Sequence, residues 1–212
     1  MGTSCYKPSA IKDIDKNIYI IAIVGESGTG KDHVLRSLDT LPDCEGFEFN
    51  PIISMTTRPQ RDGERNHIDY YFVDEEGFMK EEFLETSNFN GWWYGTAMKA
   101  LSNKCVNVGV FNPEGIRSLS DILDDDHYSI IRVRTSPEER LLRQLSRANN
   151  VAPAEIVRRY YTDEEDFKNF CYHWGGKYKT YDNNNELDAE VVRLQIAKLI
   201  WQYNGQIKSN NS

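Results

Sequence analysis

The sequence lacks the features that mark membrane, secreted and nucleic-acid-binding proteins. Its longest apolar run, residues 18–24, has seven residues, whereas a helix needs about 20 to cross a bilayer. The segment before it, residues 1–17, is polar and contains no apolar signal-peptide core. The formal net charge is −8, so we expect no basic surface that could neutralise a nucleic-acid backbone. We therefore expect a cytoplasmic protein with neither membrane nor nucleic-acid partners.

Cysteine is also scarce, and its spacing excludes two further classes of protein. The four cysteines are Cys5, Cys44, Cys105 and Cys171. They are too scattered for a disulfide framework and do not have the spacing of metal ligands, so we expect free thiols. Hydrophobic residues make up 39% of the 212 residues, which is enough for the core of one α/β domain.

One ordered pattern lies near the N-terminus. The apolar run Ile18–Val24 predicts a strand, and Gly-x-x-x-x-Gly-Lys follows it directly, from Gly25 to Lys31. Val34, Leu35 and Leu38 then recur at helical spacing. A strand, a glycine-rich turn and a helix favour phosphate binding, because backbone N–H groups curl around the anion at a helix N-terminus. The residues predicted to bind a nucleotide, which the family resemblance described below implies is ATP, are Gly25, Glu26, Ser27, Gly28, Thr29, Gly30, Lys31 and Asp32.

The simplest alternative for this pattern is a glycine-rich turn with one exposed lysine. The pattern also contains one unusual residue, because Asp32 occupies the position after Lys31 where Ser or Thr usually contacts Mg²⁺. A carboxylate can hold Mg²⁺ directly or through water. We therefore predict Mg²⁺ as the cofactor and Asp32 as its ligand.

Strand-like and helix-like segments alternate along most of the chain. Apolar segments such as Val106–Phe111 and Tyr128–Val133 predict strands, and segments with helical spacing follow them. This rhythm, opening on a phosphate-binding loop, predicts an α/β fold of the P-loop NTPase type, with a parallel sheet flanked by helices. The aromatic-rich block 55–95 interrupts the rhythm and predicts an inserted mixed α/β lobe.

The inserted block contains candidates for binding a second phosphate. Arg58 and Arg61 lie three residues apart in a polar loop, and Tyr70 and Tyr94 follow in the same block. Guanidinium groups and phenol hydroxyls are suited to clamping a phosphate. For the two arginines alone, a solvated loop is the simpler interpretation.

A second group of basic residues lies on two predicted helices. It consists of Arg140, Arg143, Arg147, Arg158 and Arg159. Like charges on one helical face destabilise a helix unless an anion lies opposite. Together with Lys31, these residues favour arginines that close over a transferring phosphoryl group. The alternative is a solvated face balanced by Glu138, Glu139 and Glu155, and the acidic run 163–166 is likewise interpreted as solvated.

Several separated motifs, in order, resemble the guanylate kinase family from about residue 20 to residue 201. They are residues 25–31, Ser-Met-Thr-Thr-Arg at 54–58 with Arg61 and Gly-Glu at 63–64, Asp-Tyr-Tyr-Phe-Val at 69–73, and the block from Phe-Leu-Glu at 83–85 to Trp-Trp-Tyr-Gly-Thr at 92–96. The resemblance implies a P-loop core, a nucleoside-monophosphate lobe and a mobile helical lid. It also implies that ATP is the co-substrate and that GMP, or dGMP, is phosphorylated to the diphosphate.

The resemblance assigns the acceptor site by position. The residues implied to hold the phosphate of GMP are Arg58, Arg61, Tyr70 and Tyr94. Ser54 and Glu85 would read guanine, with Thr96 beside them. A carboxylate can accept hydrogen bonds from guanine N1–H and the 2-amino group, which adenine does not offer together, so the discrimination between the bases can be large.

The donor side follows from the same resemblance. Lys31 and the lid or hinge arginines Arg143, Arg147 and Arg159 are implied to be catalytic. Asn184 resembles an asparagine near the adenine of ATP. These groups would stabilise the charge that spreads over the transferred phosphoryl group.

The sequence departs from the family pattern in two places. Asp32 replaces a serine, and Val110 and Asn112 occupy the positions of an Asp-x-Asp pair that helps to hold guanine and the Mg²⁺ waters. Asn112 is retained as a substrate-binding candidate, and Asp32 could restore the lost negative charge. Two alternatives stay open: a deoxynucleoside-monophosphate kinase of altered acceptor range, and a guanylate-kinase-like binding module without catalysis.

These expectations divide the chain into an arm, a domain and a tail. The predicted segments are the polar arm 1–17, the guanylate-kinase-like domain 18–205 and the polar tail 206–212. Within the domain they are the core 18–54, 96–142 and 168–205, the monophosphate-binding lobe 55–95 and the lid 143–167. The sequence leaves the oligomeric state undetermined.

Overall fold

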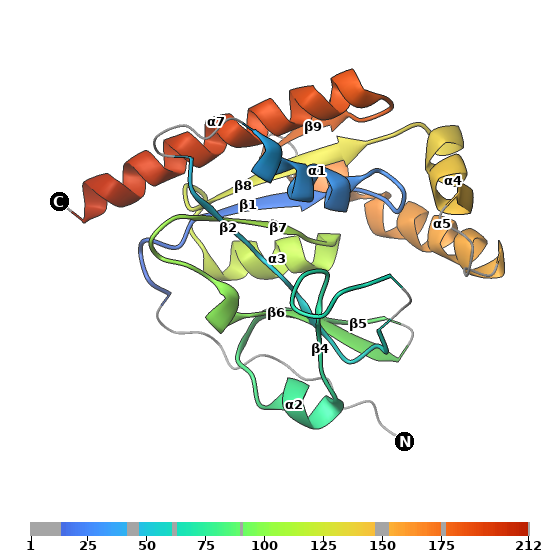
Figure 1. Cartoon of the computed structure of the whole chain (residues 1–212), viewed down its shortest axis with the longest axis horizontal. Coiled ribbons are helices and arrows are strands. Elements are labelled where there is room, and N and C mark those ends of the chain that lie inside the picture. Colours follow the sequence, from blue (N-terminus) through green and yellow to red (C-terminus); the bar gives the residue numbers. More distant parts are fainter. Residues whose placement is uncertain are drawn as a thin grey trace.

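The computed structural model describes residues 14–41, 47–60, 63–89, 91–146, 153–174 and 177–211. These residues form two β-sheets with helices packed around them (Figure 1). One sheet has five strands in the order β2-β7-β1-β8-β9, and the other has four strands in the order β4-β3-β6-β5.

The larger sheet is parallel throughout. Its strands are β1 (Ile20–Val24), β2 (Phe49–Pro51), β7 (Val106–Val110), β8 (Tyr128–Arg134) and β9 (Tyr178–Asp182), and each neighbouring pair is parallel. All five side chains of β1 are buried, which explains its continuous apolar sequence, because a central parallel strand is covered on both faces. The predicted parallel sheet flanked by helices is therefore confirmed.

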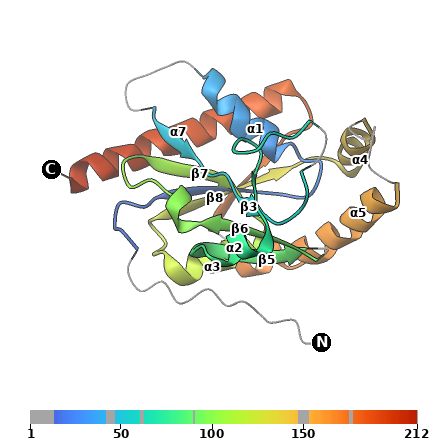
Figure 2. The ribbon, with the colours of Figure 1, turned by 60° about the horizontal axis from the view of Figure 1, so that its bottom comes forward.

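Helices cover both faces of this sheet, as Figures 1 and 2 show. The helices around this sheet and its carboxyl edge are α1 (Lys31–Ser37), α3 (Pro113–Ile122), α4 (Pro137–Ser146), α5 (Pro153–Phe167), α6 (Phe170–Trp174) and α7 (Glu186–Asn210), with short 3₁₀ turns at Leu38–Thr40 and Met98–Ala100. Alternate residues of β1 enter two cores. Ile20 packs in a cluster with Ile116 of α3, and Ile21 packs in another with Val192 of α7.

The smaller sheet is mixed and is formed by the block predicted as an insertion. It contains β3 (Met55–Thr56), β4 (Tyr71–Phe72), β5 (Phe83–Phe89) and β6 (Trp92–Ala97), with the helix α2 (Glu75–Met79) against it. Strand β3 is parallel to β4 and antiparallel to β6. Phe78 and Phe83 stack with 4.3 Å between ring centroids and, with Met55 and Ala97, form a core of its own.

The two ends of the chain differ from the predicted arm and tail. The predicted boundary after residue 205 is wrong, because α7 continues to Asn210 and Ile207 is only 2% exposed. Ile207 extends the buried stripe of Ile200 and Tyr203, while Lys208, Ser209 and Asn210 after it are exposed. Of the predicted arm, residues 1–13 lie outside the described residues, and Ile14 packs against the core. Within the described part of the chain, no helix combines the length and apolar character of a membrane span.

Candidate active site

The glycine-rich loop connects β1 to α1 at the carboxyl edge of the larger sheet. Gly28 and Gly30 have φ values of 84° and 86°, a backbone region that only glycine enters without strain. A Cβ on Gly25 would lie 2.3 Å from the Val133 carbonyl oxygen, and one on Gly28 would lie 2.7 Å from the Arg140 carbonyl oxygen. Both backbone conformation and space therefore require glycines here.

Lys31 lies folded over this loop. Its Nζ donates to the Glu26 carbonyl oxygen at 2.9 Å. Burial lowers the pKa of Lys31, and the carboxylates of Asp32 and Asp163 partly oppose that change. The lysine is thus positioned beside the loop backbone, where the negative charge of a bound phosphate would compensate for the hydration that burial removes.

The Glu26 side chain anchors the loop to the sheet. Its carboxylate accepts a hydrogen bond from Arg132 Nη2 at 2.8 Å, and each side chain is 12% exposed. Arg132 also lies over the rings of Phe167 and Phe170, at 5.1 and 5.4 Å from their centroids. Glu26 was predicted to bind ATP, and in this structure its carboxylate is committed to this ion pair.

Ser27 contacts a carboxylate that the sequence analysis did not single out. The Ser27 N–H donates to Asp163 Oδ2 at 2.8 Å, and its hydroxyl donates to Oδ1 at 3.3 Å. Arg140 is 4% exposed, and its Nη2 lies 3.0 Å from Asp163 Oδ2. The interpretation of residues 163–166 as a solvated face is therefore wrong for Asp163, which is 14% exposed. One sequence signal existed: Asp163 shares a helical face with the buried residues Ile156 and Phe167.

Asparagines after β9 support the loop from the other side. Asn183 is 3% exposed and donates from Nδ2 to the Thr29 carbonyl oxygen at 2.7 Å. Asn184, predicted to lie near adenine, is exposed, and its Oδ1 accepts the Ser136 N–H at 2.9 Å. The sequence analysis missed Asn183, although it stands next to Asn184 in an asparagine run.

A cavity of about 430 Å³ brings the two halves of the predicted site together. On the loop side its lining includes Ser27 and Lys31, and on the side of the smaller sheet it includes Ser54 and Glu85. Residues predicted for the donor and for the acceptor therefore share one cavity. Its lining also contains the predicted residues Gly25, Tyr70, Tyr94, Asn112 and Arg159.

Glu85 is a buried acidic residue in the lining of this cavity. The side chain is 8% exposed, and one carboxylate oxygen accepts a hydrogen bond from the Thr96 hydroxyl at 2.9 Å. Burial raises the pKa of Glu85 to about 7, although the hydrogen bonds from Thr96 oppose this change. Because the raised pKa means a desolvated carboxyl group, donors from a ligand would find a strong acceptor here.

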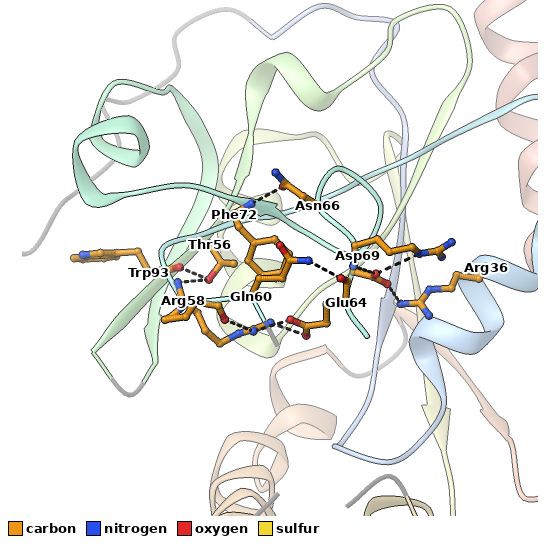
Figure 3. Close-up of polar contacts among 11 residues, drawn as sticks. Arg36, Thr56, Arg58, Gln60, Glu64, Asn66, Asp69, Phe72 and Trp93 are labelled. Carbon is orange, nitrogen blue, oxygen red and sulfur yellow. Dashed lines mark hydrogen bonds and ion pairs between the residues drawn. The ribbon is translucent and has the colours of Figure 1, made fainter. Parts of the chain in front are cut away.

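Arg58 lies in the same half of the site and is already paired. It is 7% exposed and contacts Glu64 through Nη1 at 2.8 Å and Nη2 at 2.9 Å (Figure 3). Its guanidinium group lies over the ring of Tyr70, 5.3 Å from the centroid, and burial raises the pKa of Tyr70 to about 12. Arg58, Tyr70 and Tyr94 line a second, polar cavity of about 600 Å³. Arg61 lies outside the described residues.

The remaining arginines are partly balanced by acidic residues of their own helices. Arg143 Nε contacts Glu139 at 2.9 Å. Arg158 and Arg159 both contact Glu155, at 2.7 and 2.9 Å, and these hydrogen bonds lower the pKa of Glu155 to about 2. The alternative of local counter-charges thus accounts for part of this group, while Arg159 also lines the main cavity. Arg147 lies outside the described residues.

Asn112 lines the main cavity, and Asp32 lines the polar one. Asp32 is exposed and lines the polar cavity with Arg58 and Tyr70. Among the described residues, no three or more His, Cys, Asp or Glu side chains group into a metal site, but one solvent-facing carboxylate beside Lys31 suits Mg²⁺ held through water. Asn112 caps α3, with Oδ1 accepting the Gly115 N–H at 2.7 Å.

The fold and the cavity together define a class of enzyme. A glycine-rich loop with a lysine faces a small mixed sheet with a buried carboxyl group across one cavity, which is the arrangement of a nucleoside-monophosphate kinase. The family model described as guanylate kinase matches residues 17–173. The chain belongs to the guanylate kinase family, as its separated motifs predicted.

Individual relatives agree with this assignment. The chain is 31% identical over 166 residues to a guanylate kinase of Wigglesworthia glossinidia brevipalpis, over 73% of this chain and 76% of that relative. It is 29% identical over 159 residues to one of Campylobacter jejuni (strain RM1221), over 71% and 75% of the two chains. Its fold is similar to that of guanylate kinase from Anaplasma phagocytophilum, with a TM-score of 0.54 and 19% identity, covering 87% of this chain and 85% of that one.

Proposed function

We propose that this protein transfers the γ-phosphoryl group of ATP to GMP or dGMP and releases ADP and the nucleoside diphosphate. One observation carries the proposal: Ser54 and Glu85 share a cavity with Lys31 of the glycine-rich loop. A purine bound between the first two would present its phosphate toward the lysine. The reaction then requires positioning and charge neutralisation more than a dedicated base.

The guanine base is recognised by the groups on the smaller sheet. The Glu85 carboxylate accepts hydrogen bonds from N1–H and the 2-amino group, and Ser54 donates to O6. The bond from Thr96 fixes the Glu85 carboxylate before the base arrives. Adenine leaves this buried carboxylate without its partners, so discrimination comes from an unsatisfied polar group.

The phosphate of the acceptor lies between Arg58, Tyr70 and Tyr94. These three groups already face one cavity, and Glu64 holds the Arg58 guanidinium in place. The phosphate receives the remaining donors of Arg58 and the two phenol hydroxyls. The arrangement keeps the acceptor oxygen near the loop while leaving its line of attack open.

The donor phosphates are bound by the loop N–H groups, Lys31 and Arg159, with Arg143 on the neighbouring helix. Asp32 is the residue that would hold Mg²⁺, which would supply further neutralisation of the charge on the donor phosphates. The lid predicted over residues 143–167 includes α5 and the end of α4, and it would exclude water when both nucleotides are present. Asn184 follows Asn183, which contacts the loop at Thr29, and would lie near the base of ATP.

A panel of acceptors tests the proposal. With Mg·ATP, a coupled assay should show turnover of GMP and dGMP and little turnover of AMP, CMP or TMP. Rates for CMP or TMP similar to that for GMP would contradict guanine recognition and favour an acceptor range altered at Asn112. Calorimetry distinguishes the kinase from a binding module without catalysis, because such a module would release heat with GMP and none with Mg·ATP.

A further inference from the structure

The glycine-rich loop already binds an anion, and that anion is part of the protein. Asp163, in the C-terminal half of α5, accepts hydrogen bonds from both the N–H and the hydroxyl of Ser27. Backbone N–H groups of such a loop are the donors that phosphate oxygens normally take. The carboxylate also lines the cavity that contains Lys31.

Arg140 completes this contact and ties together the elements around the loop. Its Nη2 donates to Asp163 Oδ2 at 3.0 Å, and its Nε donates to the Ser27 carbonyl oxygen at 3.0 Å. Its guanidinium group lies over the ring of Tyr160, 5.2 Å from the centroid. The Arg140 backbone also packs closely against Gly28. One carboxylate therefore joins α5 to both the loop and α4.

We propose that Asp163 is an internal competitor of the donor phosphates, which must displace it from Ser27 and Arg140 when they bind. This inference rests on the proposed function, in which the loop binds the donor triphosphate. A carboxylate and a phosphate seek the same N–H and guanidinium donors, and two anions repel each other at hydrogen-bond distances. Once displaced, Asp163 leaves Arg140 facing the phosphate.

The contact also couples the position of α5 to donor binding. Arg159 lies on the same helix, four residues before Asp163, and lines the main cavity. When the donor phosphates displace Asp163, α5 is released from the loop. Arg159, on the same helix, therefore changes position only after a phosphate chain has bound. Breaking the contact between Asp163 and Ser27 costs free energy. This cost offsets part of the favourable phosphate binding and lowers the apparent affinity for the donor.

The test compares Asp163→Asn with two control variants by titration calorimetry. The ligands are inorganic tripolyphosphate, which contains the phosphate chain without a base, and ATP. Asp163→Asn should bind both about tenfold more tightly than the wild type, a size typical of coupling between sites. Asp163→Glu keeps the competing charge and should bind like the wild type. Glu164→Gln removes the same charge at an exposed neighbouring position and should change the affinity less than twofold.

Unchanged or weaker tripolyphosphate binding by Asp163→Asn would overturn the proposal, and so would an equal gain in Glu164→Gln.

Hydrogen exchange of the wild type tests the proposal without a variant. Saturating tripolyphosphate should speed amide exchange in residues 153–167, and slower or unchanged exchange there would contradict displacement. Turnover of GMP is measured in parallel. If turnover is present while affinity is unaffected, the competitor fails and the proposed function stands; if turnover is absent, the proposed function fails on its own readout.

Discussion

The donor and acceptor sides of the cavity are built in different ways. On the acceptor side the defining contacts are local: Glu85 and Thr96 are 11 residues apart, and Arg58 and Glu64 are 6 residues apart. On the donor side they join distant parts of the chain. Ser27 contacts Asp163 across 136 residues, and Thr29 is supported by a residue 154 positions away.

This difference shows how each side can change during catalysis. The proposed base-binding residues Glu85 and Thr96 pair in one sheet that has its own core, so we expect them to form a rigid receptor for the base. The loop is instead held by β8, α4, α5 and the turn after β9. A movement of any of these elements alters the donor site, which makes it the adjustable half.

The largest effect should come from Lys31→Met on the donor side. Loss of this charge should lower kcat with Mg·ATP and GMP about 1,000-fold, since it removes a group that stabilises the transition state. Binding of GMP, measured by calorimetry, should change little, because the acceptor contacts are local. A comparable loss in Lys80→Met, whose lysine is 69% exposed, would mean that the effect is not specific.

Glu85→Gln should produce the next largest effect, on the acceptor side. The kcat/KM for GMP should fall about 100-fold, because an amide cannot accept both hydrogen bonds from guanine, while the KM for ATP should stay within twofold. Kinetics with each substrate varied in turn measures both values. If the KM for ATP rises as strongly as the GMP parameter falls, the two sides are not independent.

The raised pKa of Glu85, about 7, gives this prediction a pH dependence. Guanine recognition needs the carboxylate, so kcat/KM for GMP should fall as pH drops below about 7, and Glu85→Gln should lack that limb. Stability changes in the opposite direction. The unfolded chain loses the Glu85 proton above the ordinary pKa of 4.5, whereas the folded protein keeps it up to about pH 7. The free energy of unfolding should therefore decrease as pH rises from about 4.5 to about 7. Urea unfolding of the wild type and of Glu85→Gln measures this term.

Asn183→Ala should have a smaller effect, and one confined to the donor side. It removes the 2.7 Å hydrogen bond from Nδ2 to the Thr29 carbonyl oxygen and leaves that oxygen with the longer bond from the Thr135 hydroxyl, at 3.4 Å, which should reduce the free energy of unfolding by about 1 kcal/mol. The affinity for ATP should fall, while that for GMP should be unchanged. Urea unfolding and calorimetry with each nucleotide test this, and Asn184→Ala, at the exposed neighbouring position, is the matched variant for stability.

Asp32→Asn should give the smallest change. If its carboxylate holds Mg²⁺, the variant should need about tenfold more Mg²⁺ for half-maximal activity, since one charged ligand is lost. The maximal rate at saturating Mg²⁺ should be nearly restored. An unchanged Mg²⁺ titration would show that Asp32 does not contribute to the metal site.

The residues that line the cavity could be predicted from the sequence, whereas the contacts that support the glycine-rich loop could not. Motifs in continuous stretches predicted the residues that share the cavity, including Ser54, Glu85 and Lys31. The contacts that hold the loop were not predicted, because Asp163 and Asn183 resemble ordinary polar residues until the fold brings them to it. The end of α7 was misplaced for a similar reason, since only packing shows that Ile207 is buried among polar neighbours.

By itself, the sequence determined the parallel sheet, the glycine-rich loop and the chemical groups that we propose bind two phosphates and a purine. It could do so because local periodicity, glycine spacing and side-chain chemistry act over short stretches of chain. The tertiary structure alone decided which of these groups are free to bind a ligand. That depends on partners such as Glu26 with Arg132 and Ser27 with Asp163, which meet only when distant elements pack together and desolvate their charges.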